Sequence, residues 1–325
     1  MSRNRLPLLA FGVFAVLALF AVPPIIEASG HPDLYYTLTL VSLLAVASAG
    51  VWITFFIGRI NIGQAAYALI GGYVSAILVT RFGISFWWTI PAAGIVAAFF
   101  STLIGLPILR LRGVYFAMVT LVSTEVARLA ALALPITNGA KGMANLPLPG
   151  PIRLGPLTLV PDFASLPNAR PAFYYLAVII MLLVFAGVWR LVNSRIGKLF
   201  VALQQNEELA ASTGINIARL RVIAYAISSF LGGVAGAVFS AVSQSIYPSS
   251  FTTQDSINFM LNCFLGGLGY VFGPMLGTLV LYFGWDLLFQ TGEFQLLIYS
   301  TLMIVLMLFL PNGLLSLGSI ARKQG

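Results

Sequence analysis

The sequence predicts an all-α polytopic membrane protein with about ten transmembrane helices, some of them short or broken, and with both termini in the cytoplasm. Of its 325 residues, 59% are hydrophobic and only 8% are charged. Apolar runs of about 20 residues, the length that spans the hydrocarbon core of a bilayer, recur from end to end. Lysine and arginine fall mainly between these runs, in the pattern of cytoplasmic loops. We expect a single transmembrane domain over residues 1–325.

The charges between the apolar runs predict which way each helix crosses. Arg3 and Arg5 place the N-terminus in the cytoplasm, and the first run is interpreted as an uncleaved span because no clear cleavage site follows it. Each later run then ends on the side that its flanking charges indicate. The predicted spans are 6–26, 34–57, 60–80, 84–109, 114–134, 172–189, 222–246, 255–268, 271–290 and 294–310.

The stretch 256–285 contains no charged residue and is long enough for more than one crossing. Taken as one crossing, it leaves Arg322 and Lys323 outside, so we break it at GGLGYVFGP, residues 266–274, where glycines and Pro274 interrupt a helix. The resulting span 255–268 is about 21 Å long at 1.5 Å per residue, which is too short to cross alone. Its backbone must be shielded by other helices or line a cavity.

Two loops stand out between the predicted spans. The loop 135–171, predicted on the periplasmic side, holds eight of the 17 prolines, which is typical of a rigid, irregular surface segment. The loop 190–221 is predicted on the cytoplasmic side and ends in a strongly polar stretch, residues 204–221.

Cysteine and histidine are too scarce for several kinds of site. Cys263 is the one cysteine and His31 the one histidine, which excludes a disulfide framework within the chain, a Cys- or His-based metal site and a Ser-His-Asp triad. The net charge of +8 reflects the cytoplasmic loops of a membrane protein and does not suggest nucleic acid. The phosphate-binding pattern G-x-x-x-x-G-K-[ST] does not occur, so any ATP must be bound by another subunit. We therefore expect no enzyme, no metal and no cofactor on this chain.

The most polar stretch of the chain is QQNEELAASTGINIARLR, residues 204–221. Asn206 suits the N-cap of a short helix, Glu207 and Glu208 suit its positive N-terminus, and Gly214 suits the position after its C-cap. Between these ends lies a small apolar patch of Leu209, Ala210 and Ala211. Two helical turns are marginal alone, so residues 206–214 need a surface on which to dock. The alternative is a solvated loop helix.

Several motifs resemble those of the branched-chain amino-acid permeases of bacterial ABC importers, in the order that the family has them. ELAASTG, residues 208–214, resembles the cytoplasmic coupling motif that sits in the ATPase subunit. The other matching segments are NIGQAAYALIGGYVSAIL (61–78), GLPILRLRGVYFAMVTL (105–121), SRIGKLFVALQQNEELAASTGINIARLRVIAYAIS (194–228) and FLGGLGYVFGPMLGTLV (264–280). The chain is more similar to the larger, M-type subunit of the family than to the H-type. It departs from the family at TNGAKGM (137–143), where Thr-Gly-Gly is more usual.

The resemblance implies a permease subunit in a bacterial inner membrane that forms half of a pathway for amino-acid uptake, with leucine, isoleucine and valine as the expected solutes. It implies four kinds of neighbour: a second homologous permease, two cytoplasmic ATP-binding subunits carrying ATP and Mg²⁺, a periplasmic solute-binding protein, and membrane lipid. The coupling helix would comprise Asn206, Glu207, Glu208, Ala210, Ala211 and Gly214. Import of urea, amides or other amino acids by the same architecture, and a self-contained secondary transporter, remain the alternatives.

Polar residues within the predicted spans are candidates for the solute pathway, because polar groups in a membrane are costly. Glu125 and Arg128 can pair on one helix face, either to orient their span, to contact a zwitterionic solute, or to relay a proton. Asp255, Asn258 and Asn262, spaced i, i+3 and i+7, share one face if their span is helical. On that face they either line a cavity or form hydrogen bonds with a neighbouring helix. The full candidate set is Asn61, Gln64, Glu125, Arg128, Asp255, Asn258 and Asn262.

Overall fold

The computed structural model describes residues 5–109, 111, 113–154 and 157–288, and beyond these residues 294, 297, 298, 300, 301, 304, 308 and 313–316. Most of the predicted span 294–310 lies outside the described residues. The same holds for three basic residues that we used for the topology, Arg3, Arg322 and Lys323, and for Arg110 and Arg112 between the fourth and fifth spans.

Long apolar helices make up most of the described chain, which is an all-α polytopic membrane protein. Within the described residues, seven helical segments are long and apolar enough to cross a membrane. The first, Phe11–Ser29, comprises the second half of α1 (Arg5–Val16), the π-helical turn η1 (Leu17–Ala21) and α2 (Val22–Ser29). The others are α3 (Asp33–Phe56), α4 (Gln64–Phe82), α5 (Phe86–Ile108), α6 (Gly113–Ala133), α7 (Arg170–Val192) and α10 (Ile217–Val242).

These seven segments confirm the first seven predicted spans, but two of the spans are shifted. The seventh was predicted over 222–246, whereas α10 runs from Ile217 to Val242, so residues 217–221 belong to the helix and not to the predicted loop. The third span was predicted from residue 60, but α4 begins at Gln64, and residues 57–63 form an irregular connection after α3. Gly58 adopts a φ of 76° in this connection, a conformation that suits glycine. Asn61 therefore lies in the connection and not on the helix.

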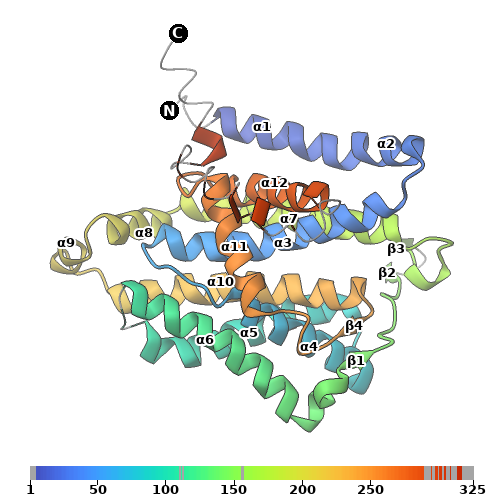
Figure 1. Ribbon diagram of the computed structural model, residues 1–325, viewed down its shortest axis with the longest axis horizontal. Helices are drawn as coiled ribbons and strands as arrows, with labels where there is room; N and C mark the ends of the chain where they lie inside the picture. Colours follow the sequence, from blue (N-terminus) through green and yellow to red (C-terminus); the bar gives the residue numbers. More distant parts are fainter. Residues whose placement is uncertain are drawn as a thin grey trace.

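Two shorter helices follow in the charge-free stretch, where only the first, 255–268, was predicted to be short. α11 (Thr253–Gly266) has 14 residues and α12 (Gly273–Leu288) has 16, with an irregular segment between them at the predicted break. In Figure 1, α11 runs across the direction of the long helices. Its length and its direction agree with a helix that does not cross the membrane alone.

Helix α10 lies at the centre of the bundle, packed against α3, α4 and α5. Small residues bring these backbones close together, which is the usual role of spaced glycines in membrane helices. A Cβ atom built on Gly236 would lie 1.8 Å from the carbonyl oxygen of Ala68 on α4, and one on Gly277 would lie 1.9 Å from that of Asn262 on α11. By contrast, a Cβ atom built on Gly269 would meet no atom within 4 Å.

The two loops contain short, regular elements. In the predicted periplasmic loop, η2 (Pro135–Thr137), η3 (Gly139–Lys141), β1 (Met143–Ala144), β2 (Ile152–Leu154), β3 (Leu157–Val160) and η4 (Phe163–Ser165) follow one another. Strand β1 pairs antiparallel with β4 (Ser245–Ile246), and β2 pairs antiparallel with β3. A last short turn, η6, covers Leu314–Ser316.

In the predicted cytoplasmic loop, α8 (Arg195–Gln205) and α9 (Glu207–Ser212) lie together at one end of the molecule. Figure 1 shows them at the left, and α1 begins toward the same end. The sequence reasoning did not predict α8. Its signal was available, because Phe200 and Leu203 lie three residues apart on a face that the structure buries.

Candidate functional site

The short helix α9 stands at the predicted place, with the predicted caps. The Asn206 side chain accepts a hydrogen bond of 3.0 Å from the backbone N–H of Leu209, which satisfies one of the free donors of the first turn. Gly214 follows the C-cap with a φ of 82°, in the left-handed region. Its N–H donates to Ala211 and that of Ile215 donates to Ala210, which completes a Schellman motif. Both ends of α9 are therefore fixed by the local sequence.

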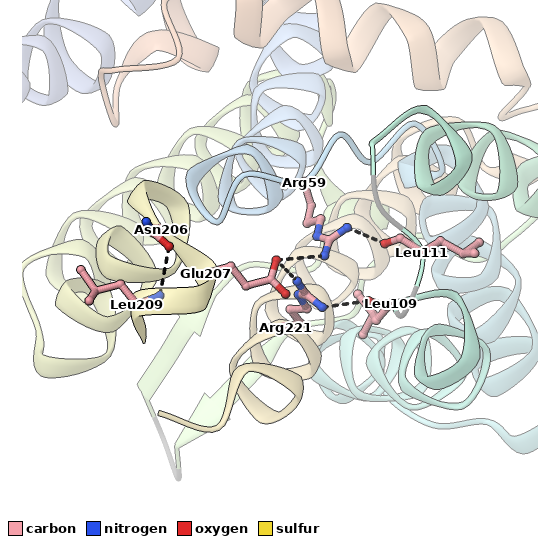
Figure 2. A network of polar contacts seen from close by, with 7 residues as sticks. All are labelled: Arg59, Leu109, Leu111, Asn206, Glu207, Leu209 and Arg221. Atoms are coloured by element: carbon pink, nitrogen blue, oxygen red, sulfur yellow. Dashed lines mark hydrogen bonds and ion pairs between the residues drawn. The ribbon is translucent and has the colours of Figure 1, made fainter. Parts of the chain in front are cut away.

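Glu207, the first residue of α9, lies between two buried arginines (Figure 2). Its Oε2 atom is 2.5 Å from Nη2 of Arg221, on the first turns of α10, and 3.7 Å from Nη2 of Arg59, in the connection between α3 and α4. The Arg59 and Arg221 side chains are 6% and 10% exposed, whereas that of Glu207 is 26% exposed. A carboxylate at this position balances two cations that have little access to water.

The two arginines also reach the turn that joins α5 to α6 (Figure 2). Arg59 Nη1 donates to the carbonyl oxygen of Leu111, and Arg221 Nη1 donates to that of Leu109 at 3.4 Å. The Arg59 guanidinium lies 6.0 Å from the ring centroid of Phe116 on α6. This cluster thus connects α9 to residues at the ends of α3, α5, α6 and α10.

The two faces of α9 differ, which corrects the predicted apolar patch. Ala210 is buried against the rest of the chain, whereas Leu209 is 64% exposed, and Glu208 and Ala211 are exposed as well. Leu209, Ala210 and Ala211 therefore do not form one surface, because consecutive helical residues point about 100° apart. The outer face combines an apolar side chain with a carboxylate and is free to meet another protein.

Gly214→Ala is expected to loosen the end of α9. A left-handed conformation costs a non-glycine residue roughly 1–2 kcal/mol, and α9 has only six residues over which to absorb this cost. Hydrogen exchange of the amides of α9 should become about fivefold faster, as a loss of about 1 kcal/mol predicts. Gly150→Ala is the control, because Gly150 has open space and no left-handed φ. Unchanged exchange in Gly214→Ala would mean that the turn does not hold the helix.

Three of the predicted pathway residues, Asp255, Asn258 and Asn262, line a cavity of about 610 Å³ whose wall is formed by α3, α11 and α12 together with Ser300 and Ile304. Asn262 also donates a hydrogen bond of 3.0 Å to Ser48 Oγ on α3. Asp255 accepts from the N–H and the hydroxyl of Thr252, both at 2.7 Å, and so caps α11. Asn258 accepts a long hydrogen bond, of 3.4 Å, from the exposed side chain of Gln254. Both alternatives for this face are therefore realised, since it lines a cavity and bonds a neighbouring helix.

Asn61 and Gln64 lie elsewhere, inside the packing of the bundle. Both are 0% exposed. The Gln64 amide donates to the Ser228 carbonyl oxygen at 2.8 Å and accepts from the Ser228 hydroxyl at 3.1 Å, joining α4 to α10. Asn61 Oδ1 accepts from the N–H of Gly63 at 2.9 Å and shapes the start of α4. These contacts favour a structural role for both residues.

Glu125 and Arg128 form the predicted pair on α6. Arg128 Nε lies 3.0 and 2.9 Å from the two Glu125 carboxylate oxygens, and Nη2 lies 2.5 Å from Oε1. The side chains are 42% and 31% exposed. The pair is therefore half-buried on α6, and neither residue lines the cavity beside α11.

Comparison with known proteins agrees with this architecture. Residues 34–311 match the family described as the permease component of branched-chain amino acid transport systems. The high-affinity branched-chain amino acid transport system permease protein LivM of Escherichia coli is 31% identical, over 93% of this chain and 73% of that protein. The probable permease LivH of Methanocaldococcus jannaschii is 26% identical over 84% and 88%, and the ribose import permease RbsC of Haemophilus influenzae is 28% identical over 60% and 53%. No solved structure matches the chain.

Proposed function

Since the chain belongs to the branched-chain amino acid permease family, we propose that it is one of two membrane-spanning subunits of an ATP-driven importer of leucine, isoleucine and valine. The observation that carries the proposal is the cluster of Glu207, Arg59 and Arg221. The cluster joins α9, a short helix with an exposed outer face, to four membrane helices. A separate ATPase that binds this outer face could therefore move the membrane helices. The chain itself carries out no reaction.

The motor in this proposal is a pair of cytoplasmic ATPase subunits, which bind ATP and Mg²⁺. One of them receives the outer face of α9, with Leu209 as its apolar contact and Glu208 and Ala211 beside it. Asn206 and Gly214 hold the two ends of the helix, and Ala210 and Glu207 attach it to the permease. A homologous second permease completes the pathway, and a periplasmic binding protein delivers the solute.

The membrane topology follows from the same proposal. The chain is a single transmembrane domain over residues 1–325, with ten membrane segments and both termini in the cytoplasm of a bacterium, in the inner membrane. The seven long helices, α11 and α12 would supply nine of these segments. The tenth would come from residues 294–310, most of which lie outside the described residues. The start of α1 lies toward the end that carries α8 and α9, which supports a cytoplasmic N-terminus.

The pathway in this proposal involves two polar surfaces. Asp255, Asn258 and Asn262 face the cavity beside α12, while Glu125 and Arg128 offer the two charges that complement the ends of an amino-acid zwitterion. Asn61 and Gln64 contribute by fixing α4 against its neighbours.

A different solute is the second candidate, because similarity also extends to a ribose import permease. Permeases of this kind thus occur with chemically unlike solutes, and urea, amides and other amino acids are to be compared with the branched-chain set. The binding protein does much of this selection, so the solute is best identified with that protein present.

The decisive experiment is purification of the chain from its native membrane together with its bound subunits, followed by reconstitution into liposomes. We expect a second permease and two ATPases to copurify, and uptake of leucine to require ATP and the binding protein. Uptake by the purified chain alone, driven by a proton gradient, would instead establish a secondary transporter. ATP-driven uptake of urea or a sugar in place of leucine would keep the importer and replace the solute.

Asn258→Leu is expected to lower uptake about fivefold or more, because one lost hydrogen bond of about 1 kcal/mol corresponds to that factor. Assembly with the ATPases should be unchanged, since Asn258 lies far along the chain from α9 and lines the cavity. Asn193→Leu, at an exposed position after α7, is the control for the same chemical change. Normal uptake kinetics in Asn258→Leu would remove this face of α11 from the pathway.

A further inference from the structure

A second cavity, of about 250 Å³, lies between the first span and α7 and is separate from the cavity beside α11. We call it the α1–α7 groove. It is lined by Phe11 of α1, by Ala186, Trp189 and Arg190 of α7, and by Phe272 in the connection between α11 and α12. The proposed solute pathway and the proposed ATPase contact use none of these residues.

One part of the α1–α7 groove is apolar and aromatic. The rings of Phe11 and Phe272 stack with their centroids 4.7 Å apart, and the ring of Phe185 lies 6.2 Å from that of Phe272. Ala186 is exposed and small, so it leaves room beside these rings. The rest of the chain buries few side chains of the first span. This part of the groove therefore suits a hydrocarbon chain.

The other part of the groove lies at a membrane boundary. Arg170 and Arg190 stand 20 residues apart near the two ends of α7, which is about 30 Å of helix and equals the thickness of the hydrocarbon core. Trp189 and Arg190 therefore lie at the level of the lipid headgroups, where tryptophan is a typical anchor. Ala186 lies about 6 Å of helix deeper. The groove thus runs from the headgroup level toward the hydrocarbon.

The boundary end of the groove is cationic. Arg190 is followed by Arg195 and Lys198 where α7 ends and α8 begins, and all three side chains are exposed. Arg195 and Lys198, three residues apart, share one face of α8. Within the part of the chain that the structure describes, none of the three forms an ion pair with a carboxylate. Their charge is therefore available to an anion from outside the chain.

We propose that the α1–α7 groove binds an anionic glycerophospholipid, with its phosphate at Arg190 and an acyl chain along Phe11, Ala186 and Phe272. A guanidinium matches a phosphate with two parallel hydrogen bonds, and basic pockets between membrane helices bind anionic headgroups. Arg195 and Lys198 add to the positive charge around the headgroup. The bound lipid fills the space between the first span and the bundle. The inference depends neither on the solute nor on the partner subunits of the proposed importer.

Native mass spectrometry of the purified full chain in detergent tests the site. The probes are phosphatidylglycerol and phosphatidylcholine with identical acyl chains, which differ in net charge. We expect phosphatidylglycerol to bind severalfold more tightly, because the choline ammonium cancels the phosphate charge near three cations. Arg190→Gln should weaken its binding about tenfold, the factor expected for one charge-assisted hydrogen bond. Arg81→Gln is the control, since Arg81 is exposed in the last turn of α4 and lines neither of the two cavities.

Ala186→Trp tests the groove separately from the charge. The fold should tolerate the larger side chain because Ala186 is exposed, and the indole would occupy the space of the acyl chain. We expect phosphatidylglycerol binding to fall about tenfold although Arg190 is intact. Ile95→Trp is the control, since Ile95 is 61% exposed on α5 and lines neither cavity. Equal unfolding temperatures of all variants in detergent would show that the fold is kept.

Three outcomes overturn the inference. The first is equal binding of the two lipids by the unmodified chain, and the second is a preference for phosphatidylglycerol that survives Arg190→Gln. The third is binding that depends on Arg190 but is unaffected by Ala186→Trp, because basic residues would then attract lipid at the surface without a groove. None of these outcomes affects the proposed function, which is tested by copurification and uptake.

Discussion

Glu207→Gln is expected to reduce ATP-driven uptake at least about tenfold while the chain still inserts and assembles. The change leaves the Arg59 and Arg221 guanidinium groups, 6% and 10% exposed, without their shared carboxylate. Removing one partner from a buried ion pair costs roughly 3–5 kcal/mol, and the partial exposure of Glu207 lowers that figure. A loss of about 1.4 kcal/mol already changes a population tenfold. A helix of two turns has too little stability of its own to compensate.

The measurement compares solute uptake with ATP hydrolysis in the reconstituted importer. We expect hydrolysis to continue in Glu207→Gln while uptake is lost, because the outer face of α9 still meets the ATPase but no longer moves the membrane helices. Glu27→Gln is the control, since Glu27 is an exposed carboxylate in α2 and has no part in the proposed coupling. Coupled transport at the normal rate in Glu207→Gln would contradict the role of the cluster.

A double-mutant cycle separates the lost charge balance from a lost contact. Arg221→Met removes one of the two cations that Glu207 balances, so adding it to Glu207→Gln should relieve part of the defect in α9 packing. Hydrogen exchange in α9 is the readout, because it reports seating of the helix directly. If the defects of the two single variants simply add, Glu207 and Arg221 act independently of one another.

The sequence predicts the membrane helices well because the bilayer imposes their length and composition. A span must be about 20 residues long and nearly free of charge, so α3, α5 and α6 could be placed within a few residues of their bounds. The caps of α9 were also predictable, because Asn206 and Gly214 act on backbone groups only a few residues away. Where one strong physical requirement acts on neighbouring residues, the local sequence pattern is enough to predict the structure.

The charged cluster could not be predicted from the same pattern. Arg59 and Arg221 follow the positive-inside rule as well as any basic residue at the end of a span, and their separate positions do not reveal that Glu207 joins them. Gln64 illustrates the opposite case. Its polarity suggested a place in the pathway, but both polar atoms of its amide form hydrogen bonds with Ser228, which lies far away in sequence on the neighbouring helix α10. Such pairings depend on how the helices pack against one another, and a hydropathy pattern does not predict that packing.

Gly236→Ala is expected to destabilise the whole bundle. The added Cβ atom would lie 1.8 Å from the carbonyl oxygen of Ala68, which belongs to the backbone of α4 and cannot rotate away. α4 and α10 must therefore separate, and the hydrogen bonds between Gln64 and Ser228 are lost with them. Overpacking of a rigid core costs typically about 1–3 kcal/mol and occasionally more, so thermal unfolding in detergent should shift down by several degrees.

Gly187→Ala supplies the matched comparison, because it is the same substitution in another membrane helix. Gly187 lies in α7 and a Cβ atom there would meet no atom within 4 Å. Alanine favours a helix by up to about 1 kcal/mol over glycine, so the unfolding temperature should stay constant or rise. Opposite signs for the two variants would show that contact between α4 and α10 requires glycine. Equal losses would instead point to a general effect of glycine on membrane helices, and the close packing of α10 would not explain Gly236.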